Sequence, residues 1–545
     1  MKSNKLQIAL IASIDKFKNT ILLSLLVGSF FFLITLSADY GHTINNVVFS
    51  ESISVSKLVN SGDALHRPSI IGTKGTTNEE NIEKWMMRFK AYSVEADEHI
   101  VIMALARIKQ SKGVFDPGFY QYGGSFIYPL GAFYFVLKEI GVLNISPLKS
   151  MLSSPDIFDD VYYYGRLFVA FFVSLSSILL FLSLRYFTSA RNSLIYTAVF
   201  LLMPATIMFA QVMKPHYYAL FWSNLALYLT IKSISIRRIS RLSNLIIGLS
   251  VGMSVGSSLV FSIFAIILWT IILFIKNMSG KLESLLVIPV ISIIIFFLFN
   301  PYLLLNFAES SQEANALQGW FDFSINNIPS NLFLYIKNSF STGFGFAFTI
   351  AYIFLMVQLS CMKKTHLKVI AVAMFVILIL MSIATSSLSS WHINTRYSPY
   401  IAPIVLIVIA YFFKDKKIIL PFLMLLFTLI QSFPLYTAYL DEDSFQYSTR
   451  LNASNWINSN IPYNSFICTS GRSIVPYDTP PFDFGKYRIN QNSCEYYISV
   501  DRQSDNLNIS KRYRLIKRYG PRYNLTSIPL VYSHINPQIS IYRNY

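Results

Sequence analysis

The chain has 545 residues, of which 53% are hydrophobic, 16% aromatic and only 13% charged, and its mean hydropathy is +0.47. The charged fraction is about half that of an ordinary soluble domain, so the main solvent is expected to be a lipid bilayer. In a soluble protein the net charge of +17 would suggest nucleic acid as a partner. Here the basic residues gather in short turns between apolar runs and in the tail, as the positive-inside rule predicts, and this distribution argues against nucleic acid. The composition therefore predicts an integral membrane protein surrounded by membrane lipids.

About eleven apolar runs are candidate transmembrane helices. They cover residues 20–37, 162–184, 193–212, 217–232, 244–257, 259–275, 284–300, 342–360, 368–387, 399–413 and 418–438. Several are shorter than the roughly 20 residues that cross a bilayer without tilt, so their boundaries are approximate. Glycines at 248, 252 and 256 suggest close helix packing in one of these runs rather than a phosphate loop, since no strand precedes them and no lysine follows. The fold class predicted is an all-α polytopic membrane bundle.

Basic residues set the expected orientation. If the lysines before the first run, within residues 1–19, lie in the cytoplasm, each even-numbered crossing returns the chain to a basic turn. These turns contain Arg185 and Arg191; Lys232, Arg237, Arg238 and Arg241; Lys276 and Lys281; Lys363, Lys364 and Lys368; and Lys414, Lys416 and Lys417. The alternative that the first run is a signal peptide, cleaved after Leu36-Ser37-Ala38, leaves the later topology unchanged.

The same alternation of crossings places three larger segments outside the cytoplasm. They are a first outer loop of residues 38–160, an outer loop of residues 301–341, and a tail of residues 440–545, so that the transmembrane domain covers residues 20–439. The chemistry is therefore expected on the extracytoplasmic side. The usage of Ile, Asn and Lys suggests a bacterial inner or plasma membrane.

The first outer loop carries an acidic pair, Asp97-Glu98, at the start of a predicted amphipathic helix. Apolar residues at 100, 103, 104 and 108 share one face of this helix, and Gly113 with Asp116-Pro117 ends it. Asp97 suits a helix N-cap, and Glu98 in the first turn suits the helix dipole. Alternatively, one carboxylate accepts a proton from an acceptor hydroxyl while the other positions the hydroxyl or a metal ion.

Several short motifs follow one another along the chain, beginning with the acidic pair. Asp97-Glu98 is followed by Asp116-Pro117, Tyr128-Pro129, Tyr164-Gly165-Arg166, Pro204, Asn300-Pro301-Tyr302, and Arg396-Tyr397 with Pro399 and Pro403. Over residues 15–440 this order resembles glycosyltransferase superfamily C, the multi-pass enzymes that use polyprenyl-phosphate sugars and include protein O-mannosyltransferases and the lipid A aminoarabinose transferase. The resemblance implies an inverting transfer of a sugar from a polyprenyl-phosphate carrier to a hydroxyl of a glycan, lipid or protein acceptor. It also implies that Asp97 is the catalytic base, with Glu98 second.

The carrier's phosphate would need cations or hydrogen-bond donors near the outer membrane edge. Topology favours Arg396 and Lys214, followed by His216, Tyr302, His392, Tyr397 and Arg166. Four of these residues have a structural alternative: Lys214 and Arg166 extending toward lipid headgroups, His216 as a solvated turn residue, and Tyr302 as part of a helix end at Asn300-Pro301-Tyr302. Many relatives carry an acid where this chain has Lys214-Pro215-His216-Tyr217, which weakens a two-acid metal site. No cofactor is therefore assigned, and no ligand spacing supports a divalent metal.

The tail is predicted to be a small α/β domain. Ser448 or Thr449 caps a helix that Asn460-Ile461-Pro462 ends, and short β-like runs follow at residues 465–468, 496–500, 513–516 and 539–542. Cys468 and Cys494 lie in this outer segment, where they either form a disulfide or remain two buried thiols.

Two other functions remain open. A polysaccharide polymerase or ligase with a lipid-diphosphate donor would depend on outside Arg or His residues more than on Asp97. A transporter or flippase of lipid-linked glycans would keep its function in Asp97→Ala, although the ionisable midplane residues and paired broken helices usual in ion-coupled transporters are not visible in the sequence.

Overall fold

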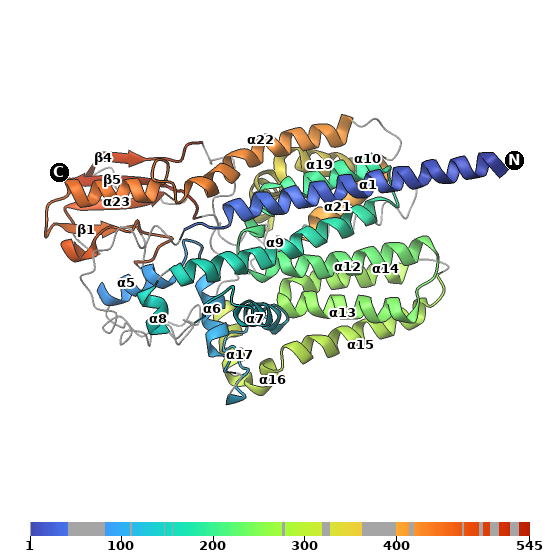
Figure 1. Cartoon of the computed structure of the whole chain (residues 1–545), viewed down its shortest axis with the longest axis horizontal. Coiled ribbons are helices and arrows are strands. Elements are labelled where there is room, and N and C mark those ends of the chain that lie inside the picture. Colours follow the sequence, from blue (N-terminus) through green and yellow to red (C-terminus); the bar gives the residue numbers. More distant parts are fainter. Residues whose placement is uncertain are drawn as a thin grey trace.

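The computed structural model places a helical bundle at one end of the molecule and a small mixed sheet at the other (Figure 1). It describes residues 2–41, 82–109, 112–145, 148–154, 156–274, 278–318, 328–361, 399–413, 419–470, 474–489, 494–501, 512–523 and 534–545. The predicted helical fold with a C-terminal α/β domain is confirmed at this level. All structural statements below concern these residues.

Five helices in the described part are long and apolar enough to cross a membrane. They are Phe17–Ser37 within α1 (Lys2–Ser37), α9 (Asp156–Leu184), α15 (Lys281–Phe299), residues Leu332–Gln358, and α22 (Ile419–Asp441). A sixth candidate is the pair α10 (Ala190–Leu202) and α11 (Pro204–Ala210), which is bent by 60°. Pro204 explains this break, because proline has no N–H with which to continue the helix.

The predicted apolar runs coincide with helices wherever the structure describes them. The remaining helices are α12 (Pro215–Ser235), α13 (Arg241–Ser257), α14 (Ser262–Phe274), α18 (Ile328–Tyr335), the π-helical segment η4 (Ile336–Gly345), α19 (Phe346–Cys361) and α21 (Ile401–Phe412). A short 3-10 turn, η2 (Leu259–Phe261), precedes α14. The run at 368–387 lies outside the described residues, and the count of eleven crossings stays a prediction.

The glycines of α13 let α15 approach closely, as the packing interpretation required. A Cβ at Gly248 would lie 2.7 Å from the Cβ of Ile291, and a Cβ at Gly252 would lie 2.7 Å from the carbonyl oxygen of Ser292. The Ser292 hydroxyl donates a hydrogen bond of 3.0 Å to the Gly248 carbonyl across this contact. Close backbone approach at small residues is a common way for membrane helices to pack.

Two turns that were assigned to the cytoplasm lie side by side at the end of the bundle away from the sheet (Figure 1). The Ile239 N–H donates to the Ser279 carbonyl, and the Ser279 N–H donates to the Arg237 carbonyl, each over 3.1 Å. The N-terminus lies at the same end. The basic turns between α12 and α13 and between α14 and α15 therefore share one end of the bundle, as one cytoplasmic side would require.

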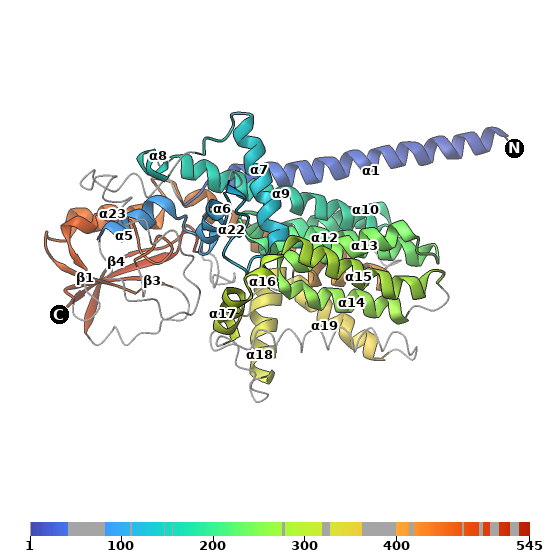
Figure 2. The ribbon, with the colours of Figure 1, turned by 90° about the horizontal axis from the view of Figure 1, so that it is seen from below.

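The first outer loop is more helical than its sequence predicted. It contains α5 (Ile82–Ala91), α6 (Glu98–Arg107), α7 (Gly124–Glu139) and α8 (Leu148–Ser153), and two short helices, α16 (Tyr302–Leu305) and α17 (Phe307–Gln318), follow α15. Helix α7 runs across the bundle: it is seen end-on in Figure 1 and lengthwise in Figure 2. The Gly124 N–H donates to Asn300 Oδ1 over 2.8 Å, and Asn300 Nδ2 donates to the Gly256 carbonyl over 3.2 Å. Asn300 thus fastens the start of α7 to α13 and α15.

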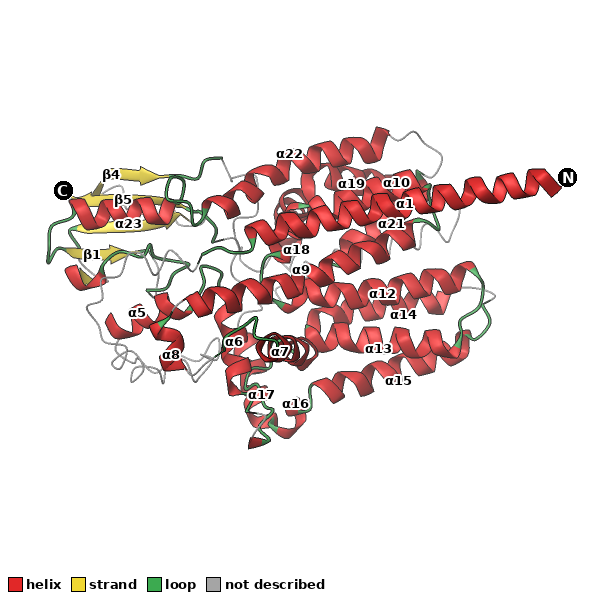
Figure 3. Cartoon of the chain, viewed as in Figure 1, coloured by secondary structure: helices red, strands yellow, loops and turns green. Residues whose placement is uncertain are grey.

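The tail forms a five-stranded sheet with the order β2-β1-β3-β5-β4 (Figure 3). Strand β1 (Phe466–Thr469) pairs in parallel with β2 (Arg488–Ile489) and β3 (Tyr496–Asp501), and β5 (Gln538–Asn544) pairs antiparallel with β3 and with β4 (Tyr513–Tyr519). Helix α23 (Thr449–Asn460) begins at Ser448, whose hydroxyl accepts from the Leu451 N–H. The four predicted strands and this helix are confirmed, whereas the two-residue β2 was not predicted. Cys468 and Cys494 form a disulfide.

Helix α5 is packed into the core of the tail domain although it belongs to the first outer loop. Phe89 is fully buried there, with its ring 5.2 Å from that of Phe484, and Trp85 also stacks edge-on against Phe484 at 6.0 Å. A second link is the Gly41 N–H, which donates to Asp443 Oδ2 over 2.8 Å. The tail domain therefore contacts the chain both before and after residues 42–81, which lie outside the described part.

Candidate active site

The segment from Tyr92 to Asp97 joins α5 to α6 at the sheet-facing end of the bundle (Figure 1). Asp97 stands at the N-cap position of α6, but its φ is +74° and its side chain makes no capping hydrogen bond. The expected N-cap role of the Asp97 carboxylate is therefore wrong. A left-handed backbone costs a residue other than glycine about 1–2 kcal/mol, and strain of this kind is typical of functional sites.

Glu98 is fully buried and held by four hydrogen bonds. Arg166 donates to both carboxylate oxygens, from Nε over 3.1 Å and from an Nη atom over 2.6 Å. The Ser93 hydroxyl donates to the same carboxylate over 2.6 Å, and the Met213 N–H donates over 2.7 Å. A carboxylate so fully paired is structural in this arrangement, because no oxygen is left free to take a proton from a substrate.

Arg166 is equally occupied, with less than 2% of its side chain exposed. Its second Nη atom donates to the carbonyls of Ala38 and Tyr40, each over 2.8 Å, and the guanidinium lies 3.7 Å from the centre of the Tyr40 ring. Arg166 was expected to hold a donor phosphate or to extend toward headgroups. The structure corrects this: the anion it binds is Glu98, and it joins the end of α1 to the first outer loop.

Asp97 turns away from this buried pair and meets Lys214. The Lys214 Nζ lies 3.4 Å from Asp97 Oδ2; Lys214 is only 5% exposed, whereas 28% of the Asp97 side chain is accessible. Lys214 precedes α12 and so comes from the turn between α11 and α12. It is buried beside an acid and does not extend toward headgroups. The structure therefore brings together two predicted site residues that are 117 positions apart in the sequence.

Glu95 is a third acid in this segment, and it was not among the predicted site residues. It is almost fully buried, and its Oε1 has no hydrogen-bond partner among the described residues. Burial raises the pKa of Glu95 to about 8, although the positive charge of Lys214 opposes the rise. Near neutral pH this carboxyl is therefore largely protonated, and it stands in the field of both Lys214 and Asp97.

His99 follows on the first turn of α6 and stacks on Tyr92, with ring centres 3.8 Å apart. Its Nδ1 is buried and has no hydrogen-bond partner among the described residues. Burial lowers the pKa of His99 to about 4, against the raising effect of Asp97. A neutral imidazole is thus expected at pH 7.

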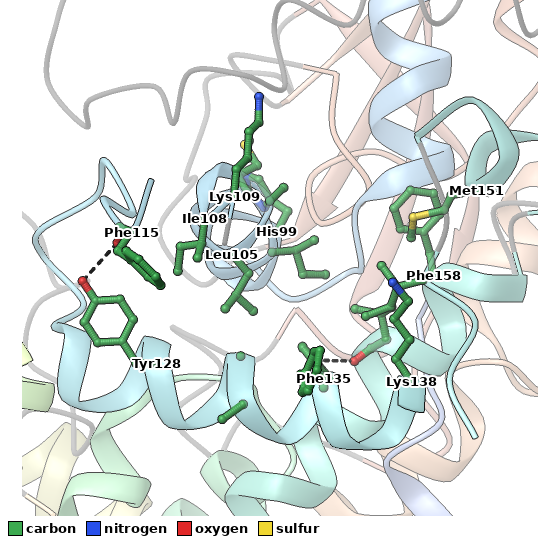
Figure 4. A pocket seen from close by; sticks show the side chains of 18 of the residues that line it. His99, Leu105, Ile108, Lys109, Phe115, Tyr128, Phe135, Lys138, Met151 and Phe158 are labelled. Atoms are coloured by element: carbon green, nitrogen blue, oxygen red, sulfur yellow. Dashed lines mark hydrogen bonds between the residues drawn. The ribbon is translucent and has the colours of Figure 1, made fainter. Parts of the chain in front are cut away.

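A cavity of about 1130 Å³ lies between α6 and α7 and extends to α8 and the start of α9 (Figure 4). His99 and Tyr92 line it, but Asp97 and Lys214 do not. Tyr302, which was predicted to bind the donor, lines the cavity beside Pro301. The cavity and the Asp97–Lys214 pair are therefore neighbours that meet at the start of α6.

Other predicted residues have different positions. His216 is buried in the first turn of α12, with Nδ1 3.3 Å from the Ser258 hydroxyl, so it is not the solvated turn residue of the alternative interpretation. Arg396, Tyr397 and His392 lie outside the described residues. Asp116 accepts from the Gly118 N–H over 2.9 Å and from Asn306 Nδ2, and so joins the two outer loops.

Within the described residues, no group of three or more His, Cys, Asp or Glu side chains is arranged to hold a metal ion. Glu95 and the Met213 N–H are the members of the site that sequence reasoning missed. An acid two positions before Asp97 was a visible signal for Glu95, but a backbone N–H that reaches a carboxylate 115 residues away leaves no trace in the sequence. Comparison with known proteins adds no assignment, since no family model and no curated protein matches the chain.

Proposed function

We propose that this protein is an integral membrane glycosyltransferase that transfers a sugar from a polyprenyl-phosphate carrier to an acceptor hydroxyl on the extracytoplasmic side. The observation that carries the proposal is the pairing of a partly exposed, strained acid, Asp97, with a buried cation, Lys214. The apolar bundle supports a lipid-linked donor, because a substrate held in the bilayer reaches the protein from the side.

In the proposed reaction Asp97 accepts the proton of the acceptor hydroxyl as the oxygen attacks the anomeric carbon of the sugar. The bond between that carbon and the phosphate oxygen breaks, and the electron pair leaves with the polyprenyl phosphate. In this proposal Lys214 supplies the positive charge that an approaching phosphate donor requires near the reaction centre. Attack from the face opposite the phosphate inverts the anomeric configuration.

The division of labour between the two adjacent acids favours Asp97 as the base. Glu98 uses both oxygens to hold Arg166, Ser93 and Met213, whereas Asp97 keeps an accessible side chain. Glu95 is a weaker candidate at neutral pH, because its raised pKa leaves it protonated. The proposal therefore needs one base and one nearby cation, with no metal ion.

The test compares purified wild type and Asp97→Asn with radiolabelled polyprenyl-phosphate sugars and lipid, glycan and protein acceptors. Asparagine tolerates the left-handed backbone at this position better than most residues, so Asp97→Asn removes the carboxylate with little change in backbone preference. Loss of a general base is expected to slow transfer by roughly 10²- to 10⁴-fold. Glu139→Gln is the matched control, because Glu139 is an exposed acid of the same outer loop at the end of α7.

Equal transfer rates for wild type and Asp97→Asn would refute the assignment of the base. Failure of wild type with every polyprenyl-phosphate sugar, together with transfer from a lipid-diphosphate donor, would favour the polymerase or ligase. A transporter would be favoured if Asp97→Ala moved a lipid-linked glycan across the membrane of vesicles at the wild-type rate.

A further inference from the structure

Lysines are the charged residues that line the described part of the cavity between α6 and α7. Among the described residues, its lining includes Lys109, Lys112 and Lys138 and contains no aspartate or glutamate. All three lysines are exposed, and none forms an ion pair within the described part of the chain. In Figure 4 Lys138 rises from α7 beside Phe158 and Met151, and Lys109 extends outward from the end of α6. Such a rim attracts an anion from the surrounding water or lipid surface.

The walls of the cavity are apolar. Leu105 and Ile108 of α6 face α7, and Phe158 with Met151 closes the end beside Lys138 (Figure 4). At the other end the Tyr128 hydroxyl donates to the Phe115 carbonyl over 3.1 Å. The cavity volume of about 1130 Å³ slightly exceeds the range of roughly 300–1,000 Å³ that is usual for ligand pockets, which suits a hydrocarbon chain better than a small ion.

Helix α7 differs from the bundle helices in its direction and in its exposed side chains. It runs across the direction of the bundle helices (Figures 1 and 2). Phe135, Val136 and Ile140 are large apolar residues exposed on it or at its end, and Lys138 lies among them. Exposed apolar side chains beside a lysine fit a position at the boundary between headgroups and acyl chains. The mouth of the cavity is then at the depth of lipid headgroups.

We propose that this cavity is a binding site for an anionic phospholipid of the outer leaflet, with the phosphate at Lys138, Lys109 and Lys112 and an acyl chain between α6 and α7. The site is separate from the reaction centre, because neither Asp97 nor Lys214 lines the cavity. A lipid held here would contact α6 along its length, and α6 begins next to Asp97. The binding does not depend on the proposed sugar transfer.

The test measures displacement of a fluorescent phosphatidylglycerol from the full-length protein in detergent. Competitors are phosphatidylglycerol, phosphatidylcholine, inorganic phosphate and farnesyl phosphate. The variant Lys109→Gln, Lys112→Gln, Lys138→Gln removes the rim charge, and Ala132→Phe narrows the cavity at an exposed lining residue of α7. The matched control Arg514→Gln, Lys517→Gln, Arg518→Gln removes the same charge from the exposed strand β4.

The lysine variant is expected to bind phosphatidylglycerol roughly 100-fold more weakly, at about fivefold for each of the three lysines near an anionic headgroup. Ala132→Phe is expected to weaken binding at least severalfold, while the β4 control binds as wild type does. Three results would overturn the proposal: equal competition by phosphatidylcholine, displacement by inorganic phosphate as effective as by lipid, or equal weakening in the β4 control. A clear preference for farnesyl phosphate would also overturn it, because the cavity would then belong to the donor.

Discussion

Replacing Glu98 with glutamine tests whether the second acid of the pair is structural. The change keeps the shape of the side chain but removes the charge opposite Arg166. The buried guanidinium then keeps the carbonyls of Ala38 and Tyr40, the Tyr40 ring and one amide oxygen as partners, but no negative charge compensates it. We expect Glu98→Gln to destabilise the protein strongly, whatever its effect on transfer.

The size of the expected loss of stability follows from the burial of both Glu98 and Arg166. Removal of one partner from a buried ion pair typically costs about 3–5 kcal/mol, because the remaining charge stays out of water without compensation. Exposed ion pairs contribute only about 0–1 kcal/mol to stability. Because Glu98 and Arg166 are both buried, we expect the larger loss for Glu98→Gln. Glu139→Gln, at an exposed position, is expected to change stability by no more than about 0.5 kcal/mol.

The assay is unfolding of the detergent-solubilised protein with sodium dodecyl sulfate, followed by the fluorescence of its six tryptophans. Arg166→Met and the double variant Glu98→Gln, Arg166→Met complete a cycle. Each single variant leaves one unpaired buried group, whereas the double variant leaves a neutral site. The double variant is therefore expected to lose less than the sum of the singles, by about 0.5–3 kcal/mol.

Two results would refute this reasoning. Additive losses in the cycle would mean that Glu98 and Arg166 do not stabilise each other. Wild-type stability of Glu98→Gln together with lost transfer would make Glu98 a reacting group and remove the argument that favours Asp97.

Three further changes test other parts of the structure. The pKa of Glu95 is about 8 in the folded protein and 4.5 in the unfolded chain, so the stability of the wild type falls as the pH rises between these values. Glu95→Gln is expected to remove that fall. The same dependence of the melting temperature on pH in wild type and Glu95→Gln would contradict this expectation. Cys468→Ser with Cys494→Ser is expected to cost about 3 kcal/mol through the loop of 26 residues that the disulfide closes, and reduced wild type should melt at the same temperature as this variant. Asn300→Ala removes the acceptor of the buried Gly124 N–H and is expected to cost about 1–3 kcal/mol; an unchanged melting temperature would show that Asn300 does not hold α7.

Local sequence signals were sufficient for the elements that carry a strong apolar or alternating pattern. The bundle helices and the strands β1, β3, β4 and β5 follow from such patterns. Helix α7 was missed because Pro129 interrupts it and glycines begin it, features that suggest a loop when the surrounding contacts are unknown. Strand β2 has two residues and exists through its pairing with β1, which no local pattern encodes.

The adjacent acids show why the site was only half predictable. Topology placed Asp97, Glu98 and Arg166 near one end of the bundle, but which acid faces the interior depends on the left-handed turn at Asp97 and on the position of α9. Both carboxylates looked equivalent in sequence, and a single residue step separates a buried ion pair from a partly exposed side chain. The Lys214 pairing likewise depends on the bend between α10 and α11 that precedes its turn.

The position of Asp97 depends on contacts made far from it. Helix α5, which leads into the acidic segment, has Phe89 in the core of the tail domain, and Arg88 donates to the Ile474 carbonyl over 3.5 Å. On the other side Glu98 is tied to α9 and to the Met213 N–H. Asp97 lies between these two anchors and adopts a backbone conformation that is unfavourable by itself. The tail domain is therefore part of the frame that holds the proposed base in place, which gives it a role in positioning even if it touches no substrate.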